Sequence, residues 1–144
     1  MNMKKIIAAL SLVFLFTTCD NNREEIIPNV SFFVSINLDD PQYADNVFIV
    51  HGDNMGNKAG INGVVVYRLS TDTYYAFDLM CTFEKQVHCL VKIKDGVTCE
   101  CPCCGSEFLI ATPYGDVISG DAPWPLKAYK TRVTGGGTML EIWN

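Results

Sequence analysis

The chain has 144 residues and a formal net charge of −5 at pH 7. Without an N-terminal export segment, about 115–120 residues remain, which is enough for one domain with a single modest core. The chain has no basic cluster, and the acidic balance makes nucleic acid a poor partner, so we expect no nucleic-acid binding.

Residues 1–18 resemble a bacterial lipoprotein signal peptide. Lys4 and Lys5 precede an apolar run over residues 6–16, which is too short to span a bilayer as a mature helix. The run ends at Cys19 in a relaxed form of the lipobox, where the cysteine becomes the lipidated first residue. Acyl chains on Cys19 would anchor the protein to a membrane. The alternative is an ordinary signal peptide with an incidental cysteine.

The polar segment after Cys19 predicts a flexible tether that extends to residue 29. A lipidated cysteine on such a tether places the remaining domain at a membrane surface. We therefore expect the protein in the bacterial cell envelope, lipid-anchored and either periplasmic or surface-exposed.

Residues 30–144 are predicted to form one all-β domain. Apolar and polar residues alternate over residues 30–38, which indicates a strand with one buried face. Further β-prone segments separated by turn residues are 47–50, 64–69, 74–77, 87–94, 97–100, 129–133 and 139–143. No segment shows a long helical period. Many short strands with regular turns predict a small β-sandwich or barrel.

The pair Asp95-Gly96 predicts a hairpin between residues 87–94 and 97–100. This dipeptide favours a type I′ turn, whose twist matches that of the flanking strands. Such a turn would place Lys92 opposite Cys99, and it would put Cys99 and Cys101 on the same face of the strand.

Two cysteine boxes, Cys81-Thr82-Phe83 and Cys101-Pro102-Cys103-Cys104-Gly105-Ser106, are separated by seventeen residues. Their spacing resembles the ligand signature of a Rieske [2Fe–2S] domain, C-x-H followed by C-x2-H. Tyr75–Asp78 and the segment Gly120–Pro123 are similar to the strand before the first box and to the proline loop of that family. The resemblance covers roughly residues 60–144. It implies a Rieske-like fold with a cluster-binding subdomain made of two loops.

The resemblance also implies a ligand set. Cys81 and Cys101 match the two cysteine ligands, whereas Phe83 and Cys104 stand at the histidine positions. Cys104 could supply a thiolate, but Phe83 offers no donor atom. The fourth ligand is therefore unknown, and the candidates are His88, Cys89, Cys99 and Cys103.

Other residues of the second box match supporting positions of the family. Gly105 and Ser106 match the cluster loop, and Ser106 corresponds to a hydroxyl that donates to a cluster sulfur. Respiratory members also join their two loops by a disulfide. Cys103 matches one half of that bridge, but the other half falls at Gln86, so we expect the bridge to be absent.

Seven cysteines less Cys19 leave six, and three hypotheses stay open for them. Disulfides are typical of exported proteins, and the candidates are Cys81, Cys89, Cys99, Cys101, Cys103 and Cys104. A zinc site is the second hypothesis, because Cys101-x-x-Cys104 is a good half-site. The third is a [2Fe–2S] cluster with altered ligands.

Two functions follow from these hypotheses. The Rieske resemblance implies an electron-transfer module that meets a redox partner protein. The alternative is a metal-free, disulfide-stapled structural or interaction lipoprotein that contacts a surface protein. We expect no independent catalysis, since Rieske-type oxygenases need a separate mononuclear iron domain.

Overall fold

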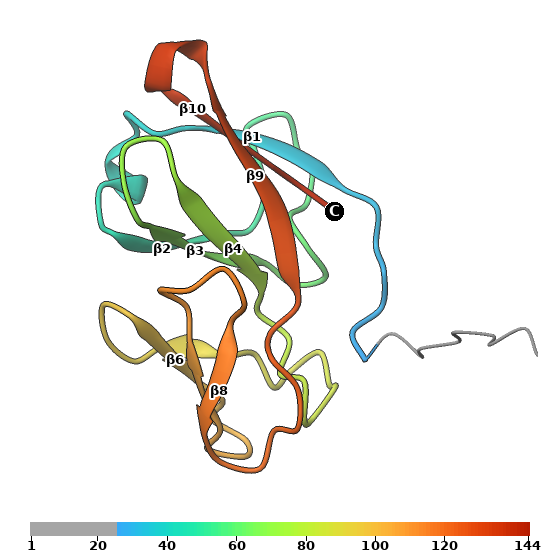
Figure 1. Cartoon of the computed structure of the whole chain (residues 1–144). Coiled ribbons are helices and arrows are strands. Elements are labelled where there is room, and N and C mark those ends of the chain that lie inside the picture. Colours follow the sequence, from blue (N-terminus) through green and yellow to red (C-terminus); the bar gives the residue numbers. More distant parts are fainter. Residues whose placement is uncertain (1–25) are drawn as a thin grey trace, which may run out of the picture.

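The structure is a computed structural model that describes residues 26–144 (Figure 1). The predicted signal peptide and Cys19 lie outside the described residues. Within residues 26–144 every regular element is a strand or a short 3-10 turn, and no helix has the length and apolar character needed to cross a membrane. The predicted all-β fold is confirmed.

The larger of two sheets contains six strands, all paired antiparallel. Their spatial order is β1 (Phe33–Asn37), β10 (Met139–Trp143), β9 (Ala128–Thr134), β4 (Tyr74–Asp78), β3 (Val64–Arg68) and β2 (Val47–Val50). The 3-10 turn η2 (Pro41–Tyr43) leads into β2, and η3 (Gly135–Gly137) joins β9 to β10.

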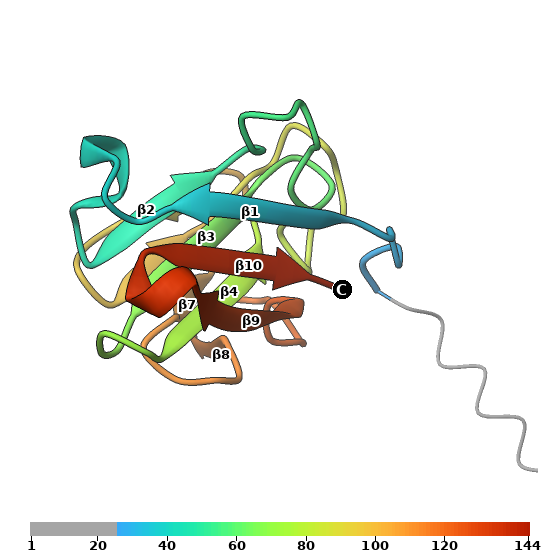
Figure 2. The same ribbon diagram turned by 90° about the horizontal axis from the view of Figure 1, so that it is seen from above.

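This sheet curls around its own core. The buried residues Val34 and Ile36 of β1 share one hydrophobic cluster with Phe48 and Val50 of β2, although β1 and β2 are the two ends of the strand order. In the view from above, β1 and β2 accordingly lie on the same side of the domain (Figure 2). The alternation predicted for residues 30–38 is confirmed, because Val34 and Ile36 point inward and their neighbours do not.

The smaller sheet is four-stranded and lies below the larger one in Figure 1. Its order is β5 (Lys92–Ile93), β6 (Thr98–Glu100), β7 (Glu107–Leu109) and β8 (Asp116–Ser119). Two loops carry the two cysteine boxes: residues 79–91 join β4 to β5, and residues 101–106 join β6 to β7.

A second core fills the space between the sheets. Along β3, Val64 and Val66 pack into the core of the larger sheet, whereas Val65 packs into the second cluster with Phe77 and Phe108. Because successive side chains of a strand point to opposite faces, β3 is buried on both sides. This explains why three consecutive valines are fully inaccessible. The second core also holds Cys81, Cys89, Cys99 and Cys101.

The hairpin around Asp95-Gly96 forms, but its predicted register is wrong. Lys92 pairs with Glu100 and Ile93 with Cys99, one residue away from the type I′ arrangement. The Asp95 side chain accepts hydrogen bonds from the N–H groups of Val97 and Thr98. Gly96 does not adopt a positive φ, which a type I′ turn requires. The side-chain hydrogen bonds of Asp95 thus select a longer turn.

Residues before β1 already pack on the domain. Ile27 is buried, and Lys127 Nζ donates to the carbonyl of Pro28 at 3.2 Å. Ile27 and Lys127 line a shallow hollow of about 270 Å³ together with Thr82, Trp124 and Pro125. The chain therefore enters the domain beside the loop that carries Cys81.

Candidate thiolate centre

A buried carboxylate at the end of β4 fixes the start of the first loop. Asp78 is fully buried and accepts hydrogen bonds from the N–H groups of Met80 at 2.7 Å and Ile61 at 2.9 Å. It also accepts the hydroxyl of Tyr129 at 2.8 Å. A buried carboxylate is tolerated when its oxygens are satisfied in this way. Cys81 follows three residues later and is held by this anchor.

The second loop is a tight turn between β6 and β7. The Gly105 N–H donates to the carbonyl of Cys101, and the Cys101 N–H donates to the carbonyl of Ser106, both at 2.9 Å. Gly105 has a φ of +72°, a conformation that glycine adopts without steric cost. The turn therefore folds the backbone so that Cys104 returns towards Cys101.

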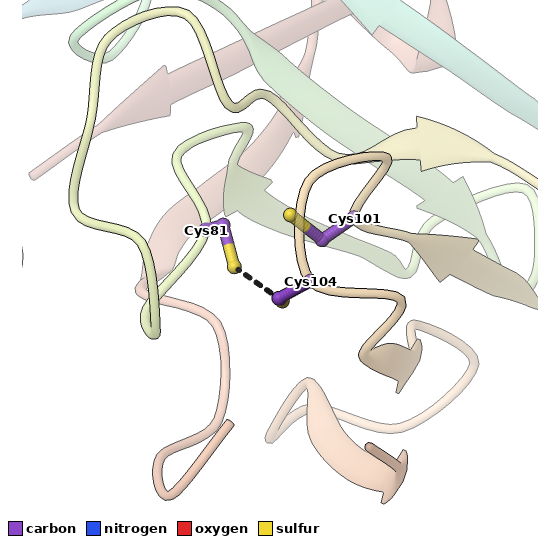
Figure 3. A group of neighbouring side chains, drawn as sticks. All are labelled: Cys81, Cys101 and Cys104. Atoms are coloured by element: carbon purple, nitrogen blue, oxygen red, sulfur yellow. Dashed lines mark hydrogen bonds between the residues drawn. The ribbon is translucent and has the colours of Figure 1, made fainter. Parts of the chain in front are cut away.

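The two loops bring three thiols together (Figure 3). The Sγ atoms of Cys81, Cys101 and Cys104 all lie within 4.8 Å of one another, and those of Cys81 and Cys104 are 3.7 Å apart. Cys81 and Cys101 are buried, whereas Cys104 is partly exposed. The cluster thus has a closed inner side and one sulfur near the surface.

The loop between β8 and β9, residues 120–127, packs against this cluster through Ser106. The Ser106 Oγ lies 3.2 Å from Cys104 Sγ and accepts the N–H of Ala122 at 3.0 Å. Gly120 has a φ of +92°, and a Cβ there would lie 2.5 Å from Ser106 Cα. Only glycine therefore allows this close approach. Such second-layer hydrogen bonds orient metal ligands in proteins.

The three thiols do not share one electrostatic environment. Burial raises the pKa of Cys81 to about 12. Burial also acts to raise the pKa of Cys104, but hydrogen bonds with Ser106, Cys101 and Cys81 outweigh it, and the pKa of Cys104 is lowered. A thiolate therefore forms more readily at the partly exposed Cys104 than at the buried Cys81.

A disulfide joins the two loops, as one of the three hypotheses for the cysteines allowed, but it does not involve position 86. Cys89 and Cys103 form a disulfide with a Cα–Cα distance of 5.8 Å. The first loop turns back on itself, because the Cys89 N–H donates to the carbonyl of Gln86 and the Cys81 N–H donates to the carbonyl of Cys89. Cys89, rather than residue 86, therefore reaches Cys103. Of the six disulfide candidates, Cys81, Cys99, Cys101 and Cys104 are free.

The remaining candidates for a fourth ligand lie elsewhere. Cys89 and Cys103 are bonded to each other, and His88 is exposed in the loop. Cys99 is buried in β6, where burial raises the pKa of its thiol to about 12. Within residues 26–144 the group of donor atoms that could share one ion consists of the three thiols alone. The sequence analysis named Cys89 and Cys103 among the disulfide candidates but did not pair them with each other.

A Rieske [2Fe–2S] cluster does not fit this donor set. Such a cluster needs two ligands on each of two irons, with histidines on one of them. Phe83 supplies no donor and its side chain is 45% exposed. Cys104 turns its sulfur to Cys81, a residue that would bind the other iron. The three thiols have the donor atoms to hold one metal ion, whereas the ligand set of a Rieske-type cluster is incomplete here.

Comparison with known proteins does not assign this chain to a family. No family model matches the chain, and no curated protein matches it. Among solved structures it is similar to a crystal structure provisionally described as an NADH-dependent nitrite reductase small subunit from Mycobacterium tuberculosis. The two chains are 14% identical with a TM-score of 0.46, over 81% of this chain and 97% of the other. Such a weak similarity says nothing about the chemistry of the thiols.

Proposed function

We propose that this chain is an electron-transfer module that holds an iron centre through Cys81, Cys101 and Cys104. The observation that carries the proposal is the convergence of three thiols from two separate loops within 4.8 Å. Thiolate ligands favour copper(I), zinc and iron. The resemblance of the two cysteine boxes to an iron-binding family favours iron.

The surroundings of the thiols suit a bound metal. Two of the three sulfurs are buried in the core between the sheets, and an inter-loop disulfide clamps both loops. A dry, hydrogen-bonded shell of this kind limits solvent access and tunes the potential of a metal. Thiolate-bound iron exchanges one electron between its ferrous and ferric states without breaking a bond.

The partly exposed Cys104 gives this electron a short path to the surface. Exposed apolar side chains stand on the neighbouring loops: Phe83 and Val87 are 45% and 63% exposed, and Trp124 is 52% exposed. Trp124 is held against the first loop, because Thr82 Oγ1 donates to its carbonyl at 2.6 Å. These side chains flank the thiols, and contiguous exposed apolar surface is typical of partner-binding sites. We propose a one-electron carrier protein as the partner.

The cell envelope is the proposed location. The export signal over residues 1–18 and lipidation at Cys19 would supply the membrane anchor and the tether. The Cys89–Cys103 disulfide supports this location, because disulfides persist mainly in exported proteins.

A metal-free interaction or structural module is the second candidate. Cys81 and Cys104 lie 3.7 Å apart, so a small shift would bring their sulfurs to the bonding distance of about 2.05 Å. Oxidation of Cys81 and Cys104 would join the two loops by a second disulfide and would remove two of the three metal ligands.

Metal analysis, absorption spectroscopy and redox titration of the full chain, isolated without oxygen, decide between these functions. We expect bound iron, visible thiolate-to-iron absorption and reversible one-electron reduction. Cys99→Ala is the matched control, because it removes a buried free thiol outside the cluster and should keep the iron. A colourless protein without metal and with few free thiols would contradict the proposal and support the second candidate.

A further inference from the structure

We infer that the centre holds a single metal ion, bound by three thiolates and one exchangeable external ligand, instead of a two-iron cluster. This inference rests on the proposed metal-binding function of Cys81, Cys101 and Cys104. It concerns the number of ions and the fourth coordination position, which the proposed function leaves open.

The spacing of the sulfurs matches one ion. Four sulfurs placed tetrahedrally at about 2.3 Å from a zinc-sized ion lie about 3.8 Å from one another. The Cys81 and Cys104 sulfurs lie 3.7 Å apart, and all three lie within 4.8 Å. Ligands on opposite irons of a cluster would be farther apart, because two irons and their bridging sulfides lie between them.

The chemistry of position 104 explains this convergence. A cysteine sulfur is bonded directly to Cβ, whereas the ring nitrogens of a histidine lie farther from the backbone. With a cysteine at 104 the donor atom therefore lies closer to the backbone of the second loop than an imidazole nitrogen would, and the observed sulfur is within 4.8 Å of those of Cys81 and Cys101. The first box has lost its donor to a second iron, because position 83 is a phenylalanine, and the second box offers a thiolate where a histidine would stand.

The fourth position has no ligand in the described part of the chain. Ser106 Oγ lies 3.2 Å from Cys104 Sγ, but it accepts the Ala122 N–H and supports the loop. Three protein ligands with an open fourth position are typical of sites that bind an exchangeable molecule. We assign the fourth position to water or to a small donor such as an imidazole or a thiol.

Titration of the full chain with Co²⁺ tests this inference. The protein is first stripped of metal without oxygen, with the Cys89–Cys103 bridge left intact. We expect the thiolate-to-cobalt absorption to saturate at one Co²⁺ per chain and to shift when imidazole is added. Acid-labile sulfide should be absent from the protein as isolated. Cys104→Ser should lose the thiolate-to-cobalt absorption in part, while Cys99→Ala should keep all of it.

The possible failures are distinguishable. Two irons with two sulfides per chain would overturn the single-ion inference and leave the proposed metal binding intact. No metal as isolated and no Co²⁺ absorption would overturn both. If the cobalt spectrum does not change when imidazole is added, the open fourth position would be overturned. If the spectrum of Cys104→Ser equals that of the wild type, binding by three thiolates would be overturned.

Discussion

Cys81 and Cys104 belong to different loops, yet their sulfur atoms lie 3.7 Å apart. Cys81 is positioned from the larger sheet through the buried Asp78, and Cys104 from the smaller sheet through a tight turn. The centre therefore lies where the two sheets meet, and any change in how they pack should alter the distance between the thiols.

Loss of the inter-loop disulfide should weaken both the fold and the site. The bridge joins residues that are 14 apart in sequence, so the double variant Cys89→Ser/Cys103→Ser should lose about 3 kcal/mol of unfolding free energy. Chemical denaturation measures this loss. Wild-type protein treated with a reductant should match the untreated variant, and equal stability of all three samples would refute the role of the bridge.

Gly120→Ala should disturb the site through Ser106. The new Cβ would lie 2.5 Å from Ser106 Cα, so Ser106 must move and its contact with Cys104 should be lost. Gly56→Ala is a matched control, because Gly56 has a similar φ of +88° but no atom within 4 Å of the added carbon. Both variants carry backbone strain of about 1–2 kcal/mol. Only Gly120→Ala should also weaken Co²⁺ binding; equal binding by both variants would argue against Ser106 as a support.

Tyr129→Phe should destabilise the fold by about 1–3 kcal/mol, because buried Asp78 then loses one hydrogen-bond donor. Burial and the neighbouring carboxylate raise the pKa of Tyr129 above its ordinary value. A raised folded-state pKa favours the protonated form, so the wild type should lose stability as pH rises beyond about 10. Denaturation as a function of pH should show a smaller alkaline loss in Tyr129→Phe; an identical loss would contradict this assignment.

Phe83→His combined with Cys104→His should restore the Rieske ligand pattern. Phe83 is exposed enough to accept an imidazole, and position 104 already lies beside Cys81. We expect the double variant to take up two irons and two sulfides per chain when it is made without oxygen. Iron and sulfide analysis measures this, with each single variant as a control. A double variant that still holds one ion would mean that the scaffold differs from a Rieske domain at the site.

The strands could be predicted from the sequence where they are long enough to show alternation, or where β-branched residues follow one another, as in residues 64–69. The alternation over residues 30–38 and the hairpin that closes the chain are both observed. The short strands Glu107–Leu109 and Asp116–Ser119 carry too few residues to show a period, and they were missed. The register of the Asp95 hairpin was also missed, because a side chain and not the backbone sets the length of the turn.

The candidate site was predicted only in part for a similar reason. The spacing of the two boxes pointed to Cys81, Cys101 and Cys104, which the structure brings together. The partner of Cys103 depends on the path of the loop between Cys81 and Cys89, and local turns determine this path. A comparison by position therefore selected Gln86, whereas the folded loop presents Cys89.

X-ray absorption spectroscopy of the metal-loaded full chain examines the centre most directly. We expect a first shell of three sulfurs at about 2.3 Å together with one lighter atom, and no second metal nearby. Cys104→Ser should lower the number of sulfurs by one, whereas Cys99→Ala should not change it. A spectrum with a neighbouring metal, or one without sulfur in the first shell, would contradict a single ion held by Cys81, Cys101 and Cys104.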